Sequence, residues 1–135
     1  MSAAPVISTD KSLLNVELIY AVLSNSYWAK DRSLEAIQKS IEHSVCFGMY
    51  LEGQQIGFAR LLTDFVVFGY LMDVFIVEKH QGKGYGQLLM RKMMEHPEHQ
   101  SIGRWFLGTQ TAHDLYRKMG FESLAHPEIW MELKS

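Results

Sequence analysis

The sequence predicts one α/β (α+β) domain, residues 1–135, in which a single mixed sheet carries helices. Some segments alternate apolar with polar residues or are continuously apolar, as strands are. Between them lie segments in which apolar residues recur at helical spacing. Two central strands are joined by a short turn, which is typical of an antiparallel hairpin. Later strands are separated by helices, which favours parallel pairing. The length suits one domain with a hydrophobic core.

The composition is that of an ordinary globular protein. Hydrophobic residues make up 47% and charged residues 21% of the chain, which sets it apart from disordered proteins. The net charge of −2 and the scattered basic residues argue against nucleic-acid binding. We expect no membrane span and no signal peptide, because no apolar stretch is long enough. Cys46 is the only cysteine, which excludes an intrachain disulfide and fits a cytoplasmic protein.

The first half of the chain is predicted to contain a strand, two helices and a hairpin. Asp10 or Ser12 is the expected cap of the first helix, and Ser33 that of the second, because short polar side chains accept from orphan helix amides. Apolar residues recur at helical spacing in both. The predicted ranges are strand 5–9, helices 12–25 and 33–43, and strands 44–50 and 55–62 around a turn at 52–54.

The second half is predicted to alternate strands with helices. Residues 66–77 are apolar almost throughout, which indicates a strand buried on both faces and inside the sheet. A proline at 97 ends the next helix, and Gly120 closes the last one. The predicted ranges are strand 66–77, helix 84–95, strand 104–108, helix 112–119, and terminal strands 121–123 and 129–133.

Residues 81–86, QGKGYG, lie between the end of a predicted strand and the start of a helix. Glycine allows positive φ and a close approach of the backbone. The first amides of a helix have no intrahelical acceptor, and the helix dipole favours an anion beside them. The segment therefore predicts a phosphate-binding loop. It lacks both the G-x-x-x-x-G-K-[ST] pattern of nucleoside-triphosphate loops and the third glycine of the dinucleotide fingerprint.

Two motifs in this order resemble the GNAT superfamily of N-acetyltransferases. Residues 81–86 match its acetyl-CoA loop, [RQ]-x-x-G-x-[GA], and residues 112–121, AHDLYRKMGF, look like its A-x-x-L-Y-x-K-x-G-F segment. The resemblance covers nearly the whole chain. It implies the GNAT fold, a mostly antiparallel sheet with a central, splayed parallel strand pair and helices on both faces. It also implies acetyl-CoA as cosubstrate. We expect no metal, because the histidines lack ligand-like spacing with other donors.

The resemblance also implies the residues that bind the cofactor. Backbone amides of the loop would hold the diphosphate, and the pantetheine arm would pair with the strand before it. The side chain of Lys83 either adds charge to a phosphate or is solvated. Thr109 stands where the family often has an asparagine facing the cofactor. The implied set is Phe75, Ile76, Val77, Gln81, Gly82, Lys83, Gly84, Tyr85, Gly86 and Thr109.

Two residues are candidates for the catalytic chemistry. By resemblance, Tyr116 gives a proton or hydrogen bond to the CoA thiolate, since a phenol can donate to sulfur; the alternative is a packing role beside Phe121. Asp73 is the one acid in the apolar strand, so burial would raise its pKa toward that of a base for the amine. The alternatives are that Asp73 caps a bulge or pairs with an arginine such as Arg60, with water relaying the proton.

The resemblance places the acceptor pocket between the first two helices and the mid-chain hairpin. Its candidate residues are Tyr27, Trp28, Asp64 and Tyr70. Trp28 could instead pack a helix on the sheet, and Asp64 could be a turn aspartate. We expect acetyl transfer to a primary amine of a small molecule or an amino terminus. The alternatives are a non-catalytic CoA-binding module and a transferase of longer acyl groups; a homodimer is a further expectation.

Overall fold

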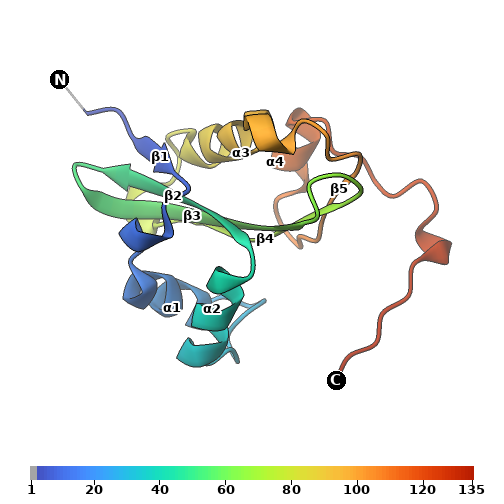
Figure 1. Ribbon diagram of the computed structural model, residues 1–135, viewed down its shortest axis with the longest axis horizontal. Helices are drawn as coiled ribbons and strands as arrows, with labels where there is room; N and C mark the ends of the chain where they lie inside the picture. The colour runs from blue at the N-terminus through green and yellow to red at the C-terminus, as the bar shows by residue number, and fades with distance from the viewer. Residues whose placement is uncertain (1–2) are drawn as a thin grey trace.

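The computed structural model describes residues 3–135, and its strands form one five-stranded sheet in the order β1-β2-β3-β4-β5. Figure 1 shows α1 and α2 on one face of this sheet and α3 and α4 on the other, as the sequence predicted. The elements are β1 (Val6–Ser8), α1 (Val16–Ser24), α2 (Leu34–Glu42), β2 (Val45–Leu51), β3 (Gln54–Thr63), β4 (Gly69–Ile76), α3 (Tyr85–Glu95), β5 (Trp105–Leu107) and α4 (His113–Lys118).

The sheet is antiparallel from β1 to β4 and parallel between β4 and β5. The β2–β3 hairpin closes through Glu52 and Gly53, both at positive φ. A register irregularity interrupts the β3–β4 ladder between Phe58 and Arg60. On the opposite strand Asp73 has φ 55°, a left-handed conformation that is uncommon for a non-glycine residue. The predicted mixed sheet with one parallel pair is confirmed.

Each face of the sheet has its own hydrophobic core. Apolar stripes of α1 and α2 bury Ile19 and Ile37 against Phe58 and Phe75 of the sheet. On the other face, the apolar side of α3 packs against β2, β3 and β4, with Leu89, Met90 and Met93 fully buried. Burial on this scale supplies most of the stability of such a domain. It also fixes β4 between the two layers.

Two helix boundaries illustrate how side-chain caps decide where a helix begins. Ser33 accepts from the amide of Ala36 and starts α2, as predicted. The first helix begins later than predicted, at Val16, because Asn15 accepts from the amide of Leu18. The predicted cap Asp10 starts only a short 3₁₀ turn, Lys11–Leu13.

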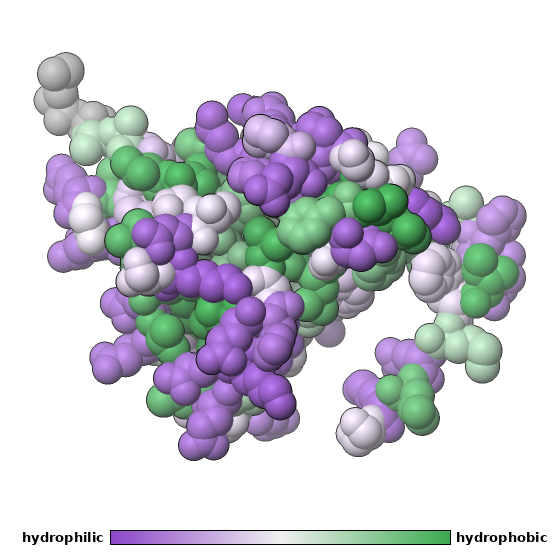
Figure 2. Space-filling model, viewed as in Figure 1, coloured by the Kyte–Doolittle hydropathy of each residue, from purple (hydrophilic) through white to green (hydrophobic). Residues whose placement is uncertain are grey.

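Two predictions about strands were wrong. No strand forms over 121–123 or 129–133; the apolar alternation there has no sheet edge beside it, and Met131 and Leu133 are almost fully exposed. Figure 1 shows this end of the chain running away from the sheet, and Figure 2 shows its hydrophobic and hydrophilic side chains apart from the body. The strand predicted from residue 66 begins at Gly69, and its side chains alternate between buried and partly exposed.

Within residues 3–135, no helix has the length and apolar character needed to cross a bilayer. The same residues contain no group of three histidine, cysteine, aspartate or glutamate side chains that could hold a metal ion.

Candidate active site

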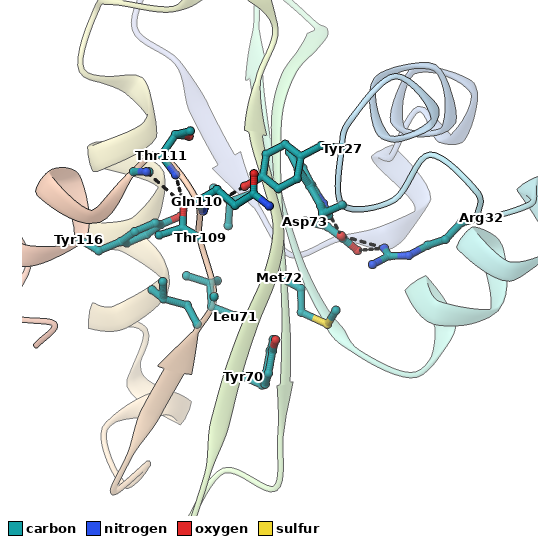
Figure 3. Close-up of a pocket in the computed structure, with 15 residues that line it drawn as sticks. Tyr27, Arg32, Tyr70, Leu71, Met72, Asp73, Thr109, Gln110, Thr111 and Tyr116 are labelled. Carbon is teal, nitrogen blue, oxygen red and sulfur yellow. Dashed lines mark hydrogen bonds and ion pairs between the residues drawn. The ribbon is translucent and has the colours of Figure 1, made fainter. Parts of the chain in front are cut away.

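The site lies where the two parallel strands part. β4 and β5 pair over three residues, the last pair being Leu71 and Leu107, while β4 continues to Ile76. The chain after β5 turns away toward α4. A pocket of about 540 Å³ lies at this point, lined by β4, the loop between α1 and α2, residues 107–112 and Tyr116. Figure 3 shows Tyr116 and Thr109 on one side of it and Asp73 and Arg32 on the other.

Tyr116 reaches the pocket from α4 and is 9% exposed. Its ring packs edge-on against Phe121, with centroids 5.8 Å apart. The predicted packing contact with Phe121 is therefore present, and it leaves the catalytic role a prediction. Burial, with a smaller contribution from the charge of Tyr27, raises the pKa of the phenol above its ordinary value of 10.0. The phenol is therefore a proton carrier at neutral pH, and it faces the space between the parted strands.

Thr109 fixes the start of the helix that carries Tyr116. Its hydroxyl oxygen accepts from the amides of Thr111 and Ala112 at 3.3 and 3.1 Å. These amides precede the first turn of α4 and would otherwise lack an acceptor. Thr109 also lines the pocket, so the hydroxyl proton remains available for a contact there. Its predicted cofactor contact stays a prediction.

Asp73 is the centre of a buried hydrogen-bond cluster on the α1–α2 face. Its Oδ1 accepts from the indole Nε1 of Trp28 at 2.9 Å and from Nη1 of Arg32 at 2.8 Å. Its Oδ2 accepts from the same Nη1 at 2.7 Å and from Nε of Arg60 at 2.9 Å. The Asp73 side chain is 1% exposed. Of the two alternatives for Asp73, pairing with an arginine such as Arg60 is confirmed.

This cluster does not favour Asp73 as the general base. Both of its oxygens already accept from cationic or aromatic N–H groups, and two guanidinium groups form ion pairs with the carboxylate. A base must take a proton, which here would break charge-assisted hydrogen bonds in a buried place. The catalytic role of Asp73 stays a prediction, with the geometry against it.

Tyr27 and Trp28 form an aromatic wall of the pocket. Their rings meet edge-on with centroids 5.1 Å apart. The hydroxyl oxygen of Tyr27 accepts from the backbone amide of Gln110 at 3.1 Å and so joins the α1–α2 loop to the segment after β5. Tyr70 also lines the pocket. Three of the four predicted acceptor residues therefore come together.

Asp64, the fourth predicted acceptor residue, does not lie in this pocket. Its Oδ1 accepts from the amides of Val66, Val67 and Phe68, which makes it the organiser of the β3–β4 turn. These bonds lower the pKa of its carboxyl group. The placement of Asp64 among the acceptor residues was wrong, and the turn interpretation is correct.

The glycine-rich loop presents a row of unused donors. Gly82 and Gly84 both have φ 79°, which glycine adopts without strain. Among residues 3–135, no acceptor pairs with the backbone amides from Gly82 to Gln87, and the first intrahelical bond of α3 comes from Leu88 to Gly84. Aligned amides at a helix N-terminus are an anion-binding arrangement.

Gln81, by contrast, has its amides engaged. Its backbone N–H donates to the carbonyl of Glu78 at 3.2 Å, and its side-chain amide donates to the carbonyl of Ile76 at 2.8 Å. The prediction that the Gln81 backbone amide joins the anion-binding row was therefore wrong. Instead, the residue ties the loop to the end of β4.

The open edge of β4 carries the second set of main-chain groups. The amide of Val77 donates to Ile56 of β3, so alternation directs the main-chain groups of Val74 and Ile76 toward the parted side. Phe75 buries its ring in the α1–α2 core. The sequence had singled out Phe75, Ile76 and Val77 for main-chain pairing with the cofactor. Of these, alternation leaves Ile76 on the open side and directs Phe75 and Val77 toward β3; the cofactor contacts themselves stay predictions.

The sequence pattern of the acetyltransferase (GNAT) family matches residues 15–121. The chain belongs to the GNAT acetyltransferase family. The matched range includes the glycine loop, the parted strands and Tyr116, so the features described above are those of a GNAT domain.

Relatives of this GNAT chain support the assignment. A crystal structure of an inferred GNAT acetyltransferase from Xanthomonas campestris shares 41% identity, with a TM-score of 0.95 over 100% of this chain and 96% of that one. An inferred acetyltransferase of Gibberella zeae is 36% identical over 110 residues, which cover 67% of this chain and 62% of the relative's length. An acetyltransferase structure from Clostridium acetobutylicum, described with acetyl-CoA, has a TM-score of 0.67 at 14% identity, covering 97% of this chain and 95% of that one, and shows the fold alone.

Proposed function

We propose that this GNAT domain transfers the acetyl group of acetyl-CoA to a primary amine of a small molecule or an amino terminus, with both substrates bound together. The observation that carries the proposal is the position of Tyr116, a buried phenol at the point where β4 and β5 part. Proton donors of this kind are needed where a thiolate leaves.

The unpaired amides from Gly82 to Gln87 would hold the diphosphate of acetyl-CoA. They lie at the start of α3, directly after the open end of β4, where the helix dipole adds to the attraction. The main-chain groups of Val74 and the amide of Ile76 on the open edge would pair with the pantetheine arm, while the Ile76 carbonyl accepts from Gln81. This arrangement directs the thioester into the pocket beside Tyr116.

The bound acetyl-CoA supplies a thioester whose acyl carbon is attacked by the amine, with loss of the CoA thiolate. Tyr116 donates a hydrogen bond or a proton to the leaving sulfur. A thiol has a pKa of about 8.5, so a thiolate is the weaker base and the phenol acts mainly by stabilising its charge. No side chain of the protein forms a covalent bond with the acyl group in this scheme; Cys46 is buried in the α1–α2 core, away from the pocket.

The acceptor amine must reach the thioester without its extra proton. Two arginines and one carboxylate leave one positive charge in excess at the acceptor side. Asp73 already accepts from Trp28, Arg32 and Arg60, so it is not free to take the ammonium proton. We propose that the amine loses its proton to water on entering this pocket, so that Asp73 need not act as the base.

The proposal is tested by incubating the protein with acetyl-CoA and a panel of primary amines while free thiol is measured. Release of thiol that depends on both the amine and the protein, together with a product heavier by one acetyl group in mass spectrometry, is the expected result. A protein that binds CoA but releases no thiol with any amine would contradict the proposal and indicate a non-catalytic CoA-binding module.

A further inference from the structure

The acceptor side of the pocket holds an arginine whose donors are only partly used. Arg32 directs a single nitrogen, Nη1, at both oxygens of Asp73. Among residues 3–135, its Nε and Nη2 have no acceptor within hydrogen-bond distance. The Arg32 side chain is 28% exposed and lines the pocket. A guanidinium group has five N–H donors, so most of its capacity faces the cavity or solvent.

Arg60, the other arginine of the cluster, has a contact at each of its three guanidinium nitrogens. Its Nε donates to Asp73, its Nη1 lies 3.4 Å from the hydroxyl of Ser44, and its Nη2 lies 3.1 Å from the sulfur of Met72. Its side chain is 6% exposed. Arg60 therefore supplies the structural counter-charge for Asp73. Arg32 supplies a second positive charge that the fold does not need for neutrality.

The charge of the pocket points to the ligand. Within residues 3–135, Arg32 and Asp73 are the only side chains with fixed charge that line it, and Arg60 pairs with Asp73 from behind. The sum is one positive charge in excess, with no carboxylate left to accept an ammonium group. One carboxylate on the ligand would neutralise this excess, whereas a phosphate monoester with two charges would overshoot it. A planar carboxylate also matches the fork of a guanidinium group.

The aromatic wall indicates what lies between the two ends of the ligand. Tyr27 and Trp28 border the same pocket next to Arg32, with exposed fractions of 50% and 40%. Figure 3 shows Tyr27 between Tyr116 and Arg32. An apolar or aromatic body would cover these rings and displace water from them.

We propose that the acceptor is an amino carboxylate: a primary amine joined through an apolar or aromatic body to a carboxylate, which the unused edge of Arg32 binds. This inference rests on the proposed function and names its substrate class. Arg32 orients the acceptor so that its amine points across the pocket toward the parted strands and Tyr116.

The test compares 4-(aminomethyl)benzoate with benzylamine, which differ only in the carboxylate. With the unmodified protein, kcat/KM for 4-(aminomethyl)benzoate is expected to exceed that for benzylamine by roughly 10- to 100-fold, as for a hydrogen bond to a charged group. In Arg32→Gln this preference is expected to disappear, because kcat/KM for the amino carboxylate falls to that for benzylamine. The control is Lys30→Gln, which removes a charge from the same loop but not from the pocket lining, and which should keep the preference.

An NMR titration tests carboxylate binding beside Arg32 without requiring turnover. The indole N–H of Trp28 donates to Asp73 beside Arg32, so its NMR signal reports on this corner of the pocket. Titration with 3-phenylpropionate is expected to shift that signal with saturation, and titration with the uncharged 3-phenylpropanamide is not. This comparison needs only the unmodified protein, so it holds even where Arg32→Gln folds poorly.

The outcomes separate the two proposals. Turnover of benzylamine equal to or better than that of 4-(aminomethyl)benzoate, or equal shifts with the acid and the amide, overturns the amino-carboxylate inference and leaves the acetyltransferase proposal standing. No thiol release with any amine overturns the acetyltransferase proposal, and the NMR titration then still decides whether Arg32 forms a carboxylate site.

Discussion

The two sides of the pocket use different parts of the chain. On the cofactor side, the groups offered to a ligand are backbone amides from Gly82 to Gln87 and the main-chain edge of β4. On the acceptor side they are side chains, with Asp73 joining Trp28 and Arg32 from a loop more than forty residues earlier. One side is a local motif, and the other is a product of tertiary folding.

The two sides also differ in whether their hydrogen-bonding groups already have partners within the protein. The loop amides have no internal partner and so are available to an anion, while Asp73 has every acceptor position occupied. Polar groups that are unpaired at a surface are available to bind a ligand, whereas polar groups that are fully paired in the interior stabilise the fold. We therefore assign binding to the first set and positioning to the second, with Tyr116 between them.

The largest expected effect is that of Tyr116→Phe. Loss of the phenol should lower kcat by about 100- to 10,000-fold, because the leaving thiolate loses its donor. The KM for acetyl-CoA should change little, since the loop amides are untouched. Thiol release measures both values. Tyr20→Phe, at an exposed position on α1, is the control, and a kcat of Tyr116→Phe within about threefold of the original would place the donor elsewhere.

The next largest effect is expected from Asp73→Asn, which tests whether Asp73 holds the pocket residues in position or takes part in catalysis. The variant leaves two guanidinium groups facing a neutral amide, so the free energy of unfolding should fall by about 3 kcal/mol, at the lower end for a broken buried pair because Arg32 is partly exposed. Urea unfolding measures this. Asp114→Asn is the control, since its pair with Arg117 is exposed and contributes little.

The same variant also tests whether Asp73 positions the pocket or acts as the general base. If Asp73 is the base, the folded fraction of Asp73→Asn should lose nearly all its activity at every amine concentration, with the same loss of stability, because the ion pairs are broken in either case. If Asp73 positions the pocket, stability should fall, and part of the activity should remain in the folded fraction.

A smaller effect is expected from Gly84→Ala, paired with Gly53→Ala. Both glycines have positive φ, at 79° and 81°, and an added Cβ would meet nothing within 4 Å at either position. Each variant should therefore lose roughly 1 kcal/mol of stability from backbone strain. Only Gly84→Ala should also weaken acetyl-CoA binding, by roughly three- to tenfold, because it displaces the loop amides.

Isothermal titration with CoA separates the two glycine variants. Equal affinity in Gly84→Ala and Gly53→Ala would mean that the loop at the start of α3 does not hold the diphosphate, and the cofactor side would have to be placed elsewhere.

The smallest effect concerns pH. Because burial raises the pKa of Tyr116 above 10.0, its phenol is protonated in the native state across the neutral range. Its contribution to stability is fully present below pH 10 and is lost as the pH rises beyond that value, where the unfolded chain ionises first. The kcat should therefore show no alkaline limb from Tyr116 below about pH 10. An alkaline limb near pH 8 that Tyr116→Phe abolishes would contradict this.

The sequence was sufficient for the parts of the site that depend on neighbouring residues. The loop 81–86 and the segment 112–121 are short motifs, so the glycine-rich turn before α3, the last helix and the place of Tyr116 in the pocket could all be predicted. The fold class followed from the same periodic patterns, because burial of alternating residues shapes strands and helices alike.

The remaining parts depended on contacts that no local pattern records. Arg32 and Asp73 are 41 residues apart, so nothing near either one predicts that they pair. Asp64 carries the turn chemistry of an aspartate that caps amides, and its charge alone was misleading. The alternation over 129–133 has the β pattern, but a strand also needs a partner edge, and the structure gives it none.

The most direct test of the account is a crystal structure of the protein with bound CoA. We predict that diphosphate oxygens lie at hydrogen-bond distance, about 2.7–3.2 Å, from amides between Gly82 and Gln87, and that the sulfur lies beside the Tyr116 hydroxyl where β4 and β5 part. A complex in which the diphosphate contacts another surface, or in which the sulfur and Tyr116 lie on opposite sides of the sheet, would contradict it.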